Sequence, residues 1–560
     1  MRIFGQTDIG SDILTSASGG GSSAPGAAEV ELTGDPSIDD LLGGHKWNTT
    51  SLGYTFPSKA SFYPDDYAEA DGFLAATSTL RYTVQKALEN YSDVCLLKFT
   101  ELAPDNKSAA LNIGMTYLND ETGNKKYDGY GYSPDDKSRS GDLWIHRNYE
   151  NASAYYVDTF LTNVVLHELG HTVGLKHPHE GVEGDPRIHD QHEFSIMSYR
   201  SYYQAPLGAR NDPWSFPQSL MMDDIAALQH MYGANFETRS GDTTYSFDPD
   251  DGRMFIDGFA QGEKSGSKIF CTIWDGGGHD TYDFSNYIYE LKVDLTPGGW
   301  STLDSTQLPN LGDDKVADGS VFNARLYHGD ARSMIEDAKG GSASDMITGN
   351  FLGNALYGND GNDSLFGMNG DDLLVGGNGD DVLRGGDDAD RLLGEAGNDT
   401  LIGERGADAL DGGPDNDLLY GGGASDTLNG SQGNDRLFGG GENDLVYGDE
   451  GADRIVGEAG DDDLYGGTED DTFYFRPGSG ADRVHDFTPG GTEDVIEIGY
   501  SRINTFAELL AATYDTDEGC VIEINPTTSV TLIGVGRSQL TAADFHVPIT
   551  LGDDISVVMG

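Results

Sequence analysis

A nine-residue repeat spans residues 345–471 and limits the fold of this part of the chain more than any other feature. An Asp recurs every nine residues from Asp345 to Asp471, with one exception, Asn354. An apolar side chain follows each of these residues two positions later, and a glycine follows each of the first fourteen four positions later. A phase held this long excludes a disordered acidic tail and predicts a parallel coil of short strands.

The spacing also indicates a ligand for the coil. Each apolar residue points inside a short strand, and each turn brings carboxylate and carbonyl oxygens together. Ca²⁺ is a hard ion that takes oxygen ligands, and glycine allows the backbone to turn. Because stacked aspartates repel one another, we expect the coil to fold only where calcium is abundant. The expected ligands in the repeats are Gly341, Asp345, Gly361, Asp363, Gly370, Asp372, Gly379, Asp381, Asp390, Gly397, Asp399, Asp408, Asp417, Asp426, Asp435, Asp444, Asp453 and Asp462.

Charge and apolar content exclude several classes of protein. The 560 residues include 95 acidic and 34 basic side chains, a formal net charge of −61. This charge excludes nucleic acids and anionic membranes as default partners. The chain starts without an apolar stretch of signal-peptide length, and no segment approaches the about 18 apolar residues of a membrane span. The three cysteines are far apart, so we expect no disulfide framework.

Residues 167–177, His-Glu-Leu-Gly-His-Thr-Val-Gly-Leu-Lys-His, indicate a zinc site. Apolar side chains recur at helical spacing over 158–173, which places His167 and His171 on one helix face. Glu168 would lie beside the metal, where a general base can take a proton from water. Gly174 can end the helix at positive φ and return His177 as third ligand. Structural histidines on an ordinary helix are the alternative, disfavoured because five positions are fixed together.

This motif, followed by Phe194-Ser-Ile-Met-Ser-Tyr199, resembles the metzincin metalloproteases, and with the repeat it resembles their serralysin branch. The resemblance implies that Met197 forms an apolar floor under the zinc. It implies that Tyr199 is a fifth zinc ligand that steadies the oxyanion during turnover. A helix over 220–235 is similar to the one that closes the serralysin protease domain. The resemblance also implies calcium ligands at Arg239, Gly241, Thr243, Asp275, Gly277, Gly278, Asp280 and Glu336.

We therefore expect an α+β metzincin-type protease domain, with a mixed sheet and helices, followed by an all-β parallel β-roll of RTX nonapeptide repeats with a β-strand cap. Helix is expected at 68–91 and strands at 52–57, 95–102 and 109–115. His179, His189 and His192 are expected on the surface. The expected domains are a propeptide or disordered segment at 1–34, the catalytic domain at 35–236, a linker and start of the roll at 237–344, the repeats at 345–480, and the cap with a secretion signal at 481–560.

Two segments before the zinc helix are expected to contact substrate. Tyr132 lies in an aromatic, glycine-bearing loop, and Trp144 lies in a short strand over 141–146. In metzincins an edge strand at this point pairs with the extended substrate backbone, as in strand addition elsewhere. A buried strand and an ordinary loop are the alternative for both segments.

By resemblance, the chain is a secreted, extracellular zinc endopeptidase that hydrolyses proteins and peptides. The other implied partners are the type I secretion machinery, since residues 538–560 resemble its uncleaved signal, and a periplasmic proteinaceous inhibitor. A monomer is expected. A non-enzymatic calcium-dependent surface or adhesion protein is the alternative, although a scaffold does not need residues 167–199. A lipase on the same repeat needs a Gly-x-Ser-x-Gly elbow, and none follows a strand and precedes a helix.

Overall fold

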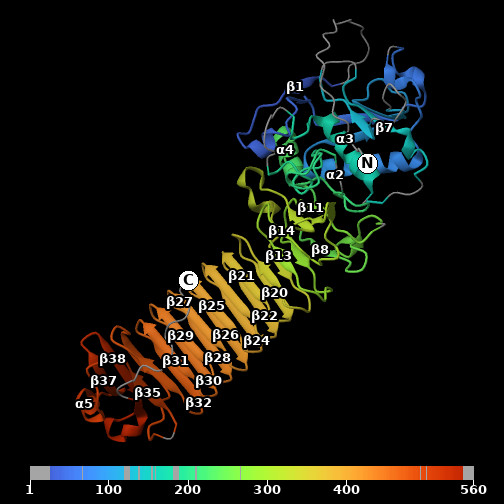
Figure 1. Cartoon of the computed structure of the whole chain (residues 1–560). Helices are drawn as coiled ribbons and strands as arrows, with labels where there is room; N and C mark the ends of the chain where they lie inside the picture. Colours follow the sequence, from blue (N-terminus) through green and yellow to red (C-terminus); the bar gives the residue numbers. More distant parts are fainter. Residues whose placement is uncertain are drawn as a thin grey trace. The chain divides into compact units, whose positions relative to one another are not determined.

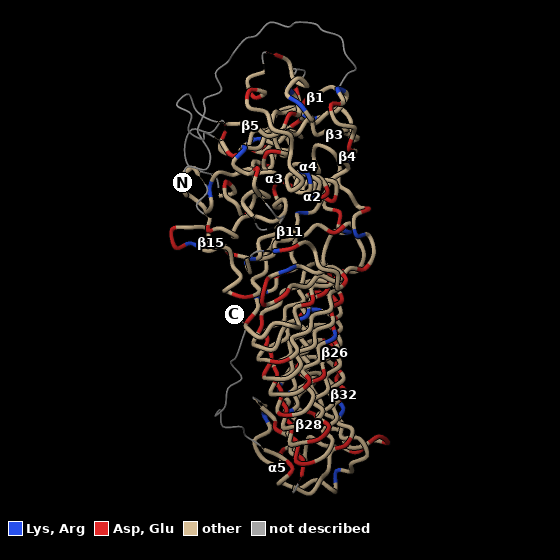
Figure 2. Tube along the Cα trace, turned by 90° about the vertical axis from the view of Figure 1, so that its right-hand side faces the viewer, with Lys and Arg blue, Asp and Glu red and all other residues tan. Residues whose placement is uncertain are grey.

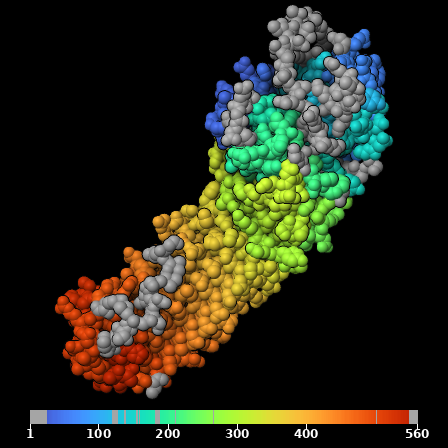
Figure 3. All heavy atoms as spheres, viewed as in Figure 1, coloured from blue at the N-terminus to red at the C-terminus, as the bar shows by residue number. Residues whose placement is uncertain are grey.

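The computed structural model describes residues 25–546, apart from 66, 119–126, 136–138, 153–155, 158, 181–187, 209–210, 265, 492 and 500. The expectations for residues 1–24 and for the secretion signal from 547 onward lie outside these described residues. The chain divides into two compact units (Figure 1 and Figure 3). The first unit comprises 1–282 and 295–335, and the second comprises 283–294 and 336–560.

The first unit contains a five-stranded mixed sheet in the order β4-β3-β5-β7-β6. Its strands are β3 (Ser51–Thr55), β4 (Lys98–Glu101), β5 (Leu111–Thr116), β6 (Gly129–Gly131) and β7 (Asp142–His146). All neighbours pair in parallel except β6, which runs antiparallel to β7 at the edge of the described sheet. The predicted mixed sheet with helices is therefore confirmed.

Three long helices accompany this sheet: α2 (Ser78–Val94), α3 (Phe160–Val173) and α4 (Met222–Tyr232). The prediction of one helix over 68–91 is wrong, because only a 3₁₀ turn forms at Ala68–Ala70 and the chain then bends at Gly72, whose φ is +86°. α2 begins only after Thr77, whose side-chain oxygen accepts a hydrogen bond from the Leu80 backbone N–H at 3.2 Å. A threonine N-cap of this kind satisfies one of the free donors of the first turn.

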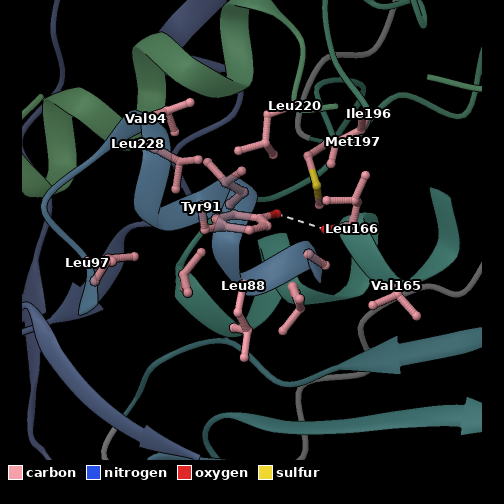
Figure 4. Packing of buried hydrophobic residues seen from close by; sticks show 14 of the residues in the cluster. Leu88, Tyr91, Val94, Leu97, Val165, Leu166, Ile196, Met197, Leu220 and Leu228 are labelled. Carbon is pink, nitrogen blue, oxygen red and sulfur yellow. Dashed lines mark hydrogen bonds between the residues drawn. The ribbon is translucent and has the colours of Figure 1, made fainter. Parts of the chain in front are cut away.

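The core between α2 and α3 supports the zinc helix (Figure 4). Tyr91 of α2 is fully buried, and its hydroxyl donates a hydrogen bond to the Leu166 carbonyl at 2.8 Å. Leu88 and Val165 are among the apolar residues that pack around it, and Met197 lies in the same cluster. Because the buried Tyr91 hydroxyl has a hydrogen-bond partner, its burial costs little free energy.

The remaining elements of the first unit are short. A strand forms at Ala27–Glu29 and pairs with His45–Trp47, so order begins before residue 35, contrary to the prediction. The short elements are β1 (Ala27–Glu29), α1 (Pro36–Asp39), β2 (His45–Trp47), η1 (Ala60–Phe62), η2 (Ala68–Ala70), η3 (Arg147–Tyr149), β8 (Thr244–Phe247), β9 (Met254–Ile256), β10 (Phe259–Ala260), β11 (Cys271–Ile273), β12 (Thr281–Asp283), β14 (Trp300–Ser301), β15 (Asn310–Gly312), β16 (Lys315–Val316), β17 (Val321–Asn323), η4 (Tyr327–Gly329) and η5 (Ala331–Ser333).

The second unit is a coil of two parallel sheets whose strands alternate along the chain (Figure 1). Strands 18 residues apart pair in register, so two repeats make one turn of the coil. Figure 2 shows that acidic residues recur along its Cα trace. The coil strands are β13 (Lys292–Asp294), β18 (Asp337–Lys339), β19 (Met346–Thr348), β20 (Ala355–Asp360), β21 (Ser364–Asn369), β22 (Leu373–Asn378), β23 (Val382–Asp387), β24 (Arg391–Ala396), β25 (Thr400–Arg405), β26 (Ala409–Pro414), β27 (Leu418–Gly423), β28 (Thr427–Gln432), β29 (Arg436–Gly441), β30 (Leu445–Glu450), β31 (Arg454–Ala459), β32 (Asp463–Thr468) and β33 (Thr472–Phe475).

The interior of the coil is a ladder of the repeat's apolar residues. Leu365, Leu383 and Leu401, for example, are 0% exposed and stack on one another through β21, β23 and β25. The end of the coil is covered by β34 (Ala481–Val484), β35 (Val495–Ile498), α5 (Phe506–Ala511), β36 (Thr513–Asp515), β37 (Gly519–Asn525), β38 (Thr528–Ile533), η6 (Arg537–Gln539), η7 (Ala542–Asp544) and β39 (Phe545–His546). The predicted parallel β-roll with a strand cap is confirmed. Among the described helices, none is long and apolar enough to cross a membrane.

The interior ladder predicts how the coil responds to a cavity. We expect Leu401→Ala to destabilise the calcium-loaded coil by about 2–5 kcal/mol, because it removes buried methylene groups and leaves a void. The matched control is Ile402→Ala on the same strand, whose side chain is only partly buried and whose loss should cost about 1 kcal/mol or less. Urea unfolding followed by circular dichroism measures both. Equal losses in the two variants would contradict the ladder.

Candidate metal centre and aspartate row

Helix α3 presents the zinc motif because both of its ends are fixed. The Thr159 side chain caps its start by accepting from the Thr162 backbone N–H at 3.3 Å. Gly174 ends it in the left-handed region, with φ at +109°. A Cβ at this glycine would lie 2.4 Å from the His45 carbonyl oxygen, so no other residue fits without movement of the backbone. The predicted helix and its glycine stop are confirmed, and Asp158 lies outside the described residues.

The structure brings His167, His171 and His177 together as the sequence predicts. Their ligand atoms lie within 4.8 Å of one another. The Nε2 atom of His177 is 3.2 Å from Nε2 of His167 and 3.0 Å from Nε2 of His171. Burial, with the neighbouring imidazoles, lowers the pKa of His167 and His177 well below the usual value, and burial lowers the pKa of His171.

The outer nitrogen of each imidazole has a partner that orients the ring. Nδ1 of His167 is 2.8 Å from the Ile196 carbonyl, and Nδ1 of His171 is 3.0 Å from the Leu175 carbonyl. These carbonyls can only accept, so Nδ1 carries the proton and Nε2 presents its lone pair inward. Nδ1 of His177 lies 2.5 Å from Glu180 Oε1. Three neutral nitrogen acceptors that converge in this way fit a zinc ion.

Glu168 lies beside the histidines and is 4% exposed. Burial raises its pKa to about 8, although a hydrogen bond from the Gly131 backbone opposes the shift. Strand β6 packs directly on this part of α3. A Cβ at Gly129 would lie 2.5 Å from Glu168 Cγ, and one at Gly131 would lie 2.2 Å from the Glu168 carbonyl oxygen. The two glycines of β6 therefore allow the sheet edge to approach the candidate general base, a role that the sequence analysis did not assign.

Met197, the residue expected to form the apolar floor of the site, is fully buried. Its sulfur would lie 2.5 Å from a Cβ at Gly170 of α3, so the turn and the helix are in close contact. Asp224 of α4 holds this turn. Its Oδ1 accepts from the Ser195 hydroxyl at 2.6 Å, and its Oδ2 accepts from the Ile196 and Met221 backbone N–H groups at 2.8 and 3.0 Å.

Asp224 was missed in the sequence analysis. The signal that could have found it is an acidic residue in the first turn of the helix after the Met turn, where a carboxylate accepts from backbone N–H groups. Its side chain is 0% exposed, and burial raises its pKa to about 7 against these hydrogen bonds.

Tyr199 packs its ring against the histidines, with centroids 4.2 Å from His177 and 5.6 Å from His167. Burial raises its pKa well above the ordinary value. The prediction that three further histidines lie on the surface is wrong for His192, which is 1% exposed and held by Asn211 and the Ser198 carbonyl. His179 stacks on His177, and His189 Nδ1 lies 2.7 Å from Asp223.

The substrate residues expected from the sequence are placed differently. Trp144 is 0% exposed, and its strand β7 is paired on both sides, so its prediction as a substrate contact on an edge strand is wrong. The edge of the described sheet is β6, and Tyr130 in its centre is 40% exposed. The Tyr132 hydroxyl is 2.5 Å from Glu69 Oε1, so its polar end has a partner within the fold.

The repeat aspartates form a continuous row in the turns of the coil. One carboxylate oxygen of each accepts a backbone N–H from 18 residues earlier, at 2.7–3.0 Å between Asp363 and Asp471. The other oxygen is buried and accepts no hydrogen bond in Asp363, Asp372, Asp381, Asp390, Asp399, Asp408, Asp417, Asp426, Asp435, Asp444, Asp453, Asp462, Asp471 and Asp482. A buried anionic oxygen without a donor is costly, and oxygen is the ligand that Ca²⁺ prefers.

Burial is also the main cause of raised pKa values along this row, from about 6 for Asp399 to about 8 for Asp417. The glycine five positions before each aspartate leaves room for the orphan oxygen: a Cβ there would lie 2.1–2.5 Å from it, between Gly358 and Gly466. Gly379 and three other predicted turn glycines, Gly361, Gly370 and Gly397, have positive φ. Asn354 differs, because its amide donates to the Glu336 carbonyl and so needs no cation.

The structure also brings together the predicted calcium residues of the first unit. Asp280 Oδ1 accepts from the Thr243 backbone N–H at 2.8 Å, and the Thr243 hydroxyl donates to the Gly241 carbonyl. Gly278 approaches Gly241 so closely that a Cβ there would lie 2.6 Å from its carbonyl oxygen. Asp275 already accepts from the Tyr245 hydroxyl and the Gly277 backbone N–H. Arg239 donates to the Trp274 carbonyl.

Comparison with known proteins gives two family matches. The family model "Peptidase M10 serralysin C terminal" matches residues 234–556, and the model "Matrixin" matches residues 65–183. The chain is similar to metalloprotease AprA of Pseudomonas entomophila, with 32% identity over 56% of this chain and 61% of that protein. It is also similar to serralysin G and serralysin A of Dickeya chrysanthemi, with 30% and 32% identity over 55% and 57% of this chain and 61% and 63% of those proteins. The matched part thus spans about three fifths of each relative.

Removal of the Asp224 carboxylate should weaken the Met turn. We expect Asp224→Ala to destabilise the first unit by about 2–5 kcal/mol, because it leaves two backbone N–H groups and a hydroxyl buried without an acceptor. Thermal unfolding by differential scanning calorimetry measures the effect. The control is His230→Ala in the last turn of the same helix, because His230 is only partly buried and contacts the Glu31 carbonyl rather than the Met turn. If Asp224→Ala lost no more stability than the control, the idea that the Asp224 carboxylate holds the Met turn would be wrong.

The raised pKa values predict a pH dependence for the calcium-free coil. A carboxyl whose folded pKa lies above its unfolded value stabilises the fold at low pH, and this stabilisation is lost as pH rises through the folded pKa. The calcium-free coil should therefore be more folded at pH 5 than at pH 8, because its stability falls as pH rises above the ordinary carboxyl pKa of 3.8 and levels off only above the folded values of about 6 to 8. Circular dichroism in a chelator tests this. A coil that gains structure from pH 5 to pH 8 without calcium would contradict the account.

Proposed function

Since this chain belongs to the serralysin family of M10 peptidases, we propose that it is a secreted zinc endopeptidase that hydrolyses proteins and peptides. One observation carries the proposal: three neutral imidazoles converge through Nε2, with a buried carboxylate beside them. A structural cluster of histidines has no need of an adjacent carboxylate that is buried and has a raised pKa.

His167, His171 and His177 would hold one zinc ion, which supplies Lewis acidity that polarises the scissile carbonyl and acidifies water. Glu168 takes a proton from the attacking water and delivers it to the leaving amine. A carboxylate with a proton affinity suited to neutral pH can do both. The Tyr199 hydroxyl stays protonated because burial raises its pKa, so it can donate to the developing oxyanion.

Strand β6 is the proposed binding site for the substrate backbone. It is the edge of the described sheet, it packs on α3 next to Glu168, and it ends the sheet with an exposed Tyr130. An extended peptide can pair with such an edge and so pass in front of the metal site. Tyr132, directly after β6, would contribute to the same binding site, because its ring contacts that of Tyr130 with centroids 4.8 Å apart.

We include calcium in the proposal as the ion that folds the coil. The support is the row of buried carboxylate oxygens that accept no hydrogen bond. Calcium is scarce inside cells and abundant outside, so the chain would become folded only after export. Export by the type I pathway, a propeptide within residues 1–34 and a periplasmic inhibitor rest on the resemblance to serralysins.

Replacement of the general base tests the proposal. Glu168→Gln should keep its zinc and lose about 10²–10⁴-fold of kcat on casein, because an amide cannot accept the proton. Glu150→Gln, on the exposed surface of the same unit, is the matched control and should keep full activity. Zinc is measured by atomic emission in both variants.

Full proteolysis by a zinc-loaded Glu168→Gln protein would sink the mechanism. A wild-type chain that binds zinc and calcium, folds, and hydrolyses no protein substrate would favour the non-enzymatic adhesion protein instead.

A further inference from the structure

A row of apolar side chains crosses the outer face of one sheet of the coil. Its members, which we call the apolar row, are Tyr420 of β27, Phe438 of β29, Val456 of β31 and Tyr474 of β33. Each follows an interior residue of its strand that is 0% exposed, so the row points to the opposite face. Tyr420, Phe438 and Val456 pair in register.

The apolar row is more buried than its place in the repeat explains. Phe438, Val456 and Tyr474 are 8%, 4% and 4% exposed. The same outward position is only partly buried in the preceding strands β21, β23 and β25 of this sheet, at Phe366, Arg384 and Ile402. The Tyr420 and Phe438 rings stack with centroids 4.8 Å apart. Phe438, Val456 and Tyr474 thus form one buried apolar cluster against which Tyr420 packs, and on this outer face they are shielded from water rather than exposed.

Two arginines border the apolar row. Arg436 and Arg454 are neighbours in register on β29 and β31. The Arg436 guanidinium lies 5.9 Å from the Phe438 ring centroid, and that of Arg454 lies 5.4 Å from the Tyr474 centroid. In a chain with 95 acidic and 34 basic residues, a pair of arginines beside apolar side chains is unusual. Arg454 is already paired with Glu497 Oε2 of β35 at 2.8 Å, whereas Arg436 is exposed. Next to Arg436 the surface fits a segment that is both apolar and acidic.

We propose that the apolar row binds residues 547–560 of the same chain. The row continues in register from Tyr474 through Glu497 of β35 to His546 of β39, the last described residue. The segment that follows, Val-Pro-Ile-Thr-Leu-Gly-Asp-Asp-Ile-Ser-Val-Val-Met-Gly, contains seven aliphatic or methionine side chains, two aspartates and no Lys or Arg. It therefore matches the apolar row by its apolar side chains and Arg436 by its aspartates.

The segment is long enough to reach. Five strand spacings separate β39 from β27 in the sheet order, or ~24 Å at about 4.8 Å per spacing. The 14 residues from 547 to 560 span up to ~46 Å when extended.

Binding of this segment would depend on calcium, and this step rests on the proposed calcium-driven folding. The members of the apolar row are 18 residues apart in sequence and meet only when the coil forms. The segment resembles a secretion signal, so it would be free for the export machinery in the unfolded chain. In the folded chain it would be covered.

Amide hydrogen exchange of residues 549–560 in the full chain, read by mass spectrometry, tests the inference. We expect at least tenfold slower exchange in calcium than in chelator, because a bound segment is protected. Phe438→Asp should remove this protection. The matched control is Tyr447→Asp, at the equivalent outward position of β30 on the other sheet, where Tyr447 stacks on Tyr465; it should keep the protection.

A second variant leaves the coil sequence intact. Asp553→Lys with Asp554→Lys should lose protection of the segment while circular dichroism shows that calcium still folds the coil. Equal exchange in calcium and chelator in a folded wild-type coil, or equal losses in the Phe438 and Tyr447 variants, would overturn the inference. Protection that increases with protein concentration would also overturn it and indicate a second copy as the source. A wild-type coil that calcium does not fold would instead refute the calcium proposal.

Discussion

The coil depends on a buried carboxylate oxygen that no proton donor satisfies, repeated once per nonapeptide. From Asp363 to Asp471 one oxygen of each aspartate ties down the preceding turn by accepting its backbone N–H, and the other accepts nothing. The same glycine that leaves room for this oxygen prevents a side chain from shielding it. The folded coil therefore carries the cost of desolvated charge until a cation or a proton removes it.

The candidate zinc site follows the same physical rule with a different ligand. The Ile196 and Leu175 carbonyls hold the outer nitrogens of His167 and His171, so their inner lone pairs face each other. Asp224 in turn holds the Met turn that supplies the Ile196 carbonyl. The orientation of the His167 ring is thus fixed by the Ile196 carbonyl, and the position of that carbonyl is fixed in turn by Asp224. In both sites the fold brings buried acceptor atoms together, although only the coil concentrates negative charge.

The features that the sequence predicted well are those carried by local periodicity. The nonapeptide phase determined strand positions and interior leucines such as Leu401, and the spacing of His167, His171 and Gly174 predicted the zinc helix and its end. Non-local pairing could not be predicted. Trp144 was expected at a sheet edge, but the pairing of β7 on both sides buries it. Gly129 and Gly131 matter only because β6 happens to pack on α3. The helix expected at 68–91 failed at Gly72, where a positive φ interrupts the periodic pattern.

The metal content of the folded chain tests most directly whether buried acceptors require cations here. The protein would be folded in calcium at pH 8, separated from free ions by gel filtration, and analysed by inductively coupled plasma mass spectrometry, with circular dichroism on the same sample. The account predicts one zinc ion and several calcium ions per folded chain. A coil that is fully folded at pH 8 and carries no calcium would contradict it.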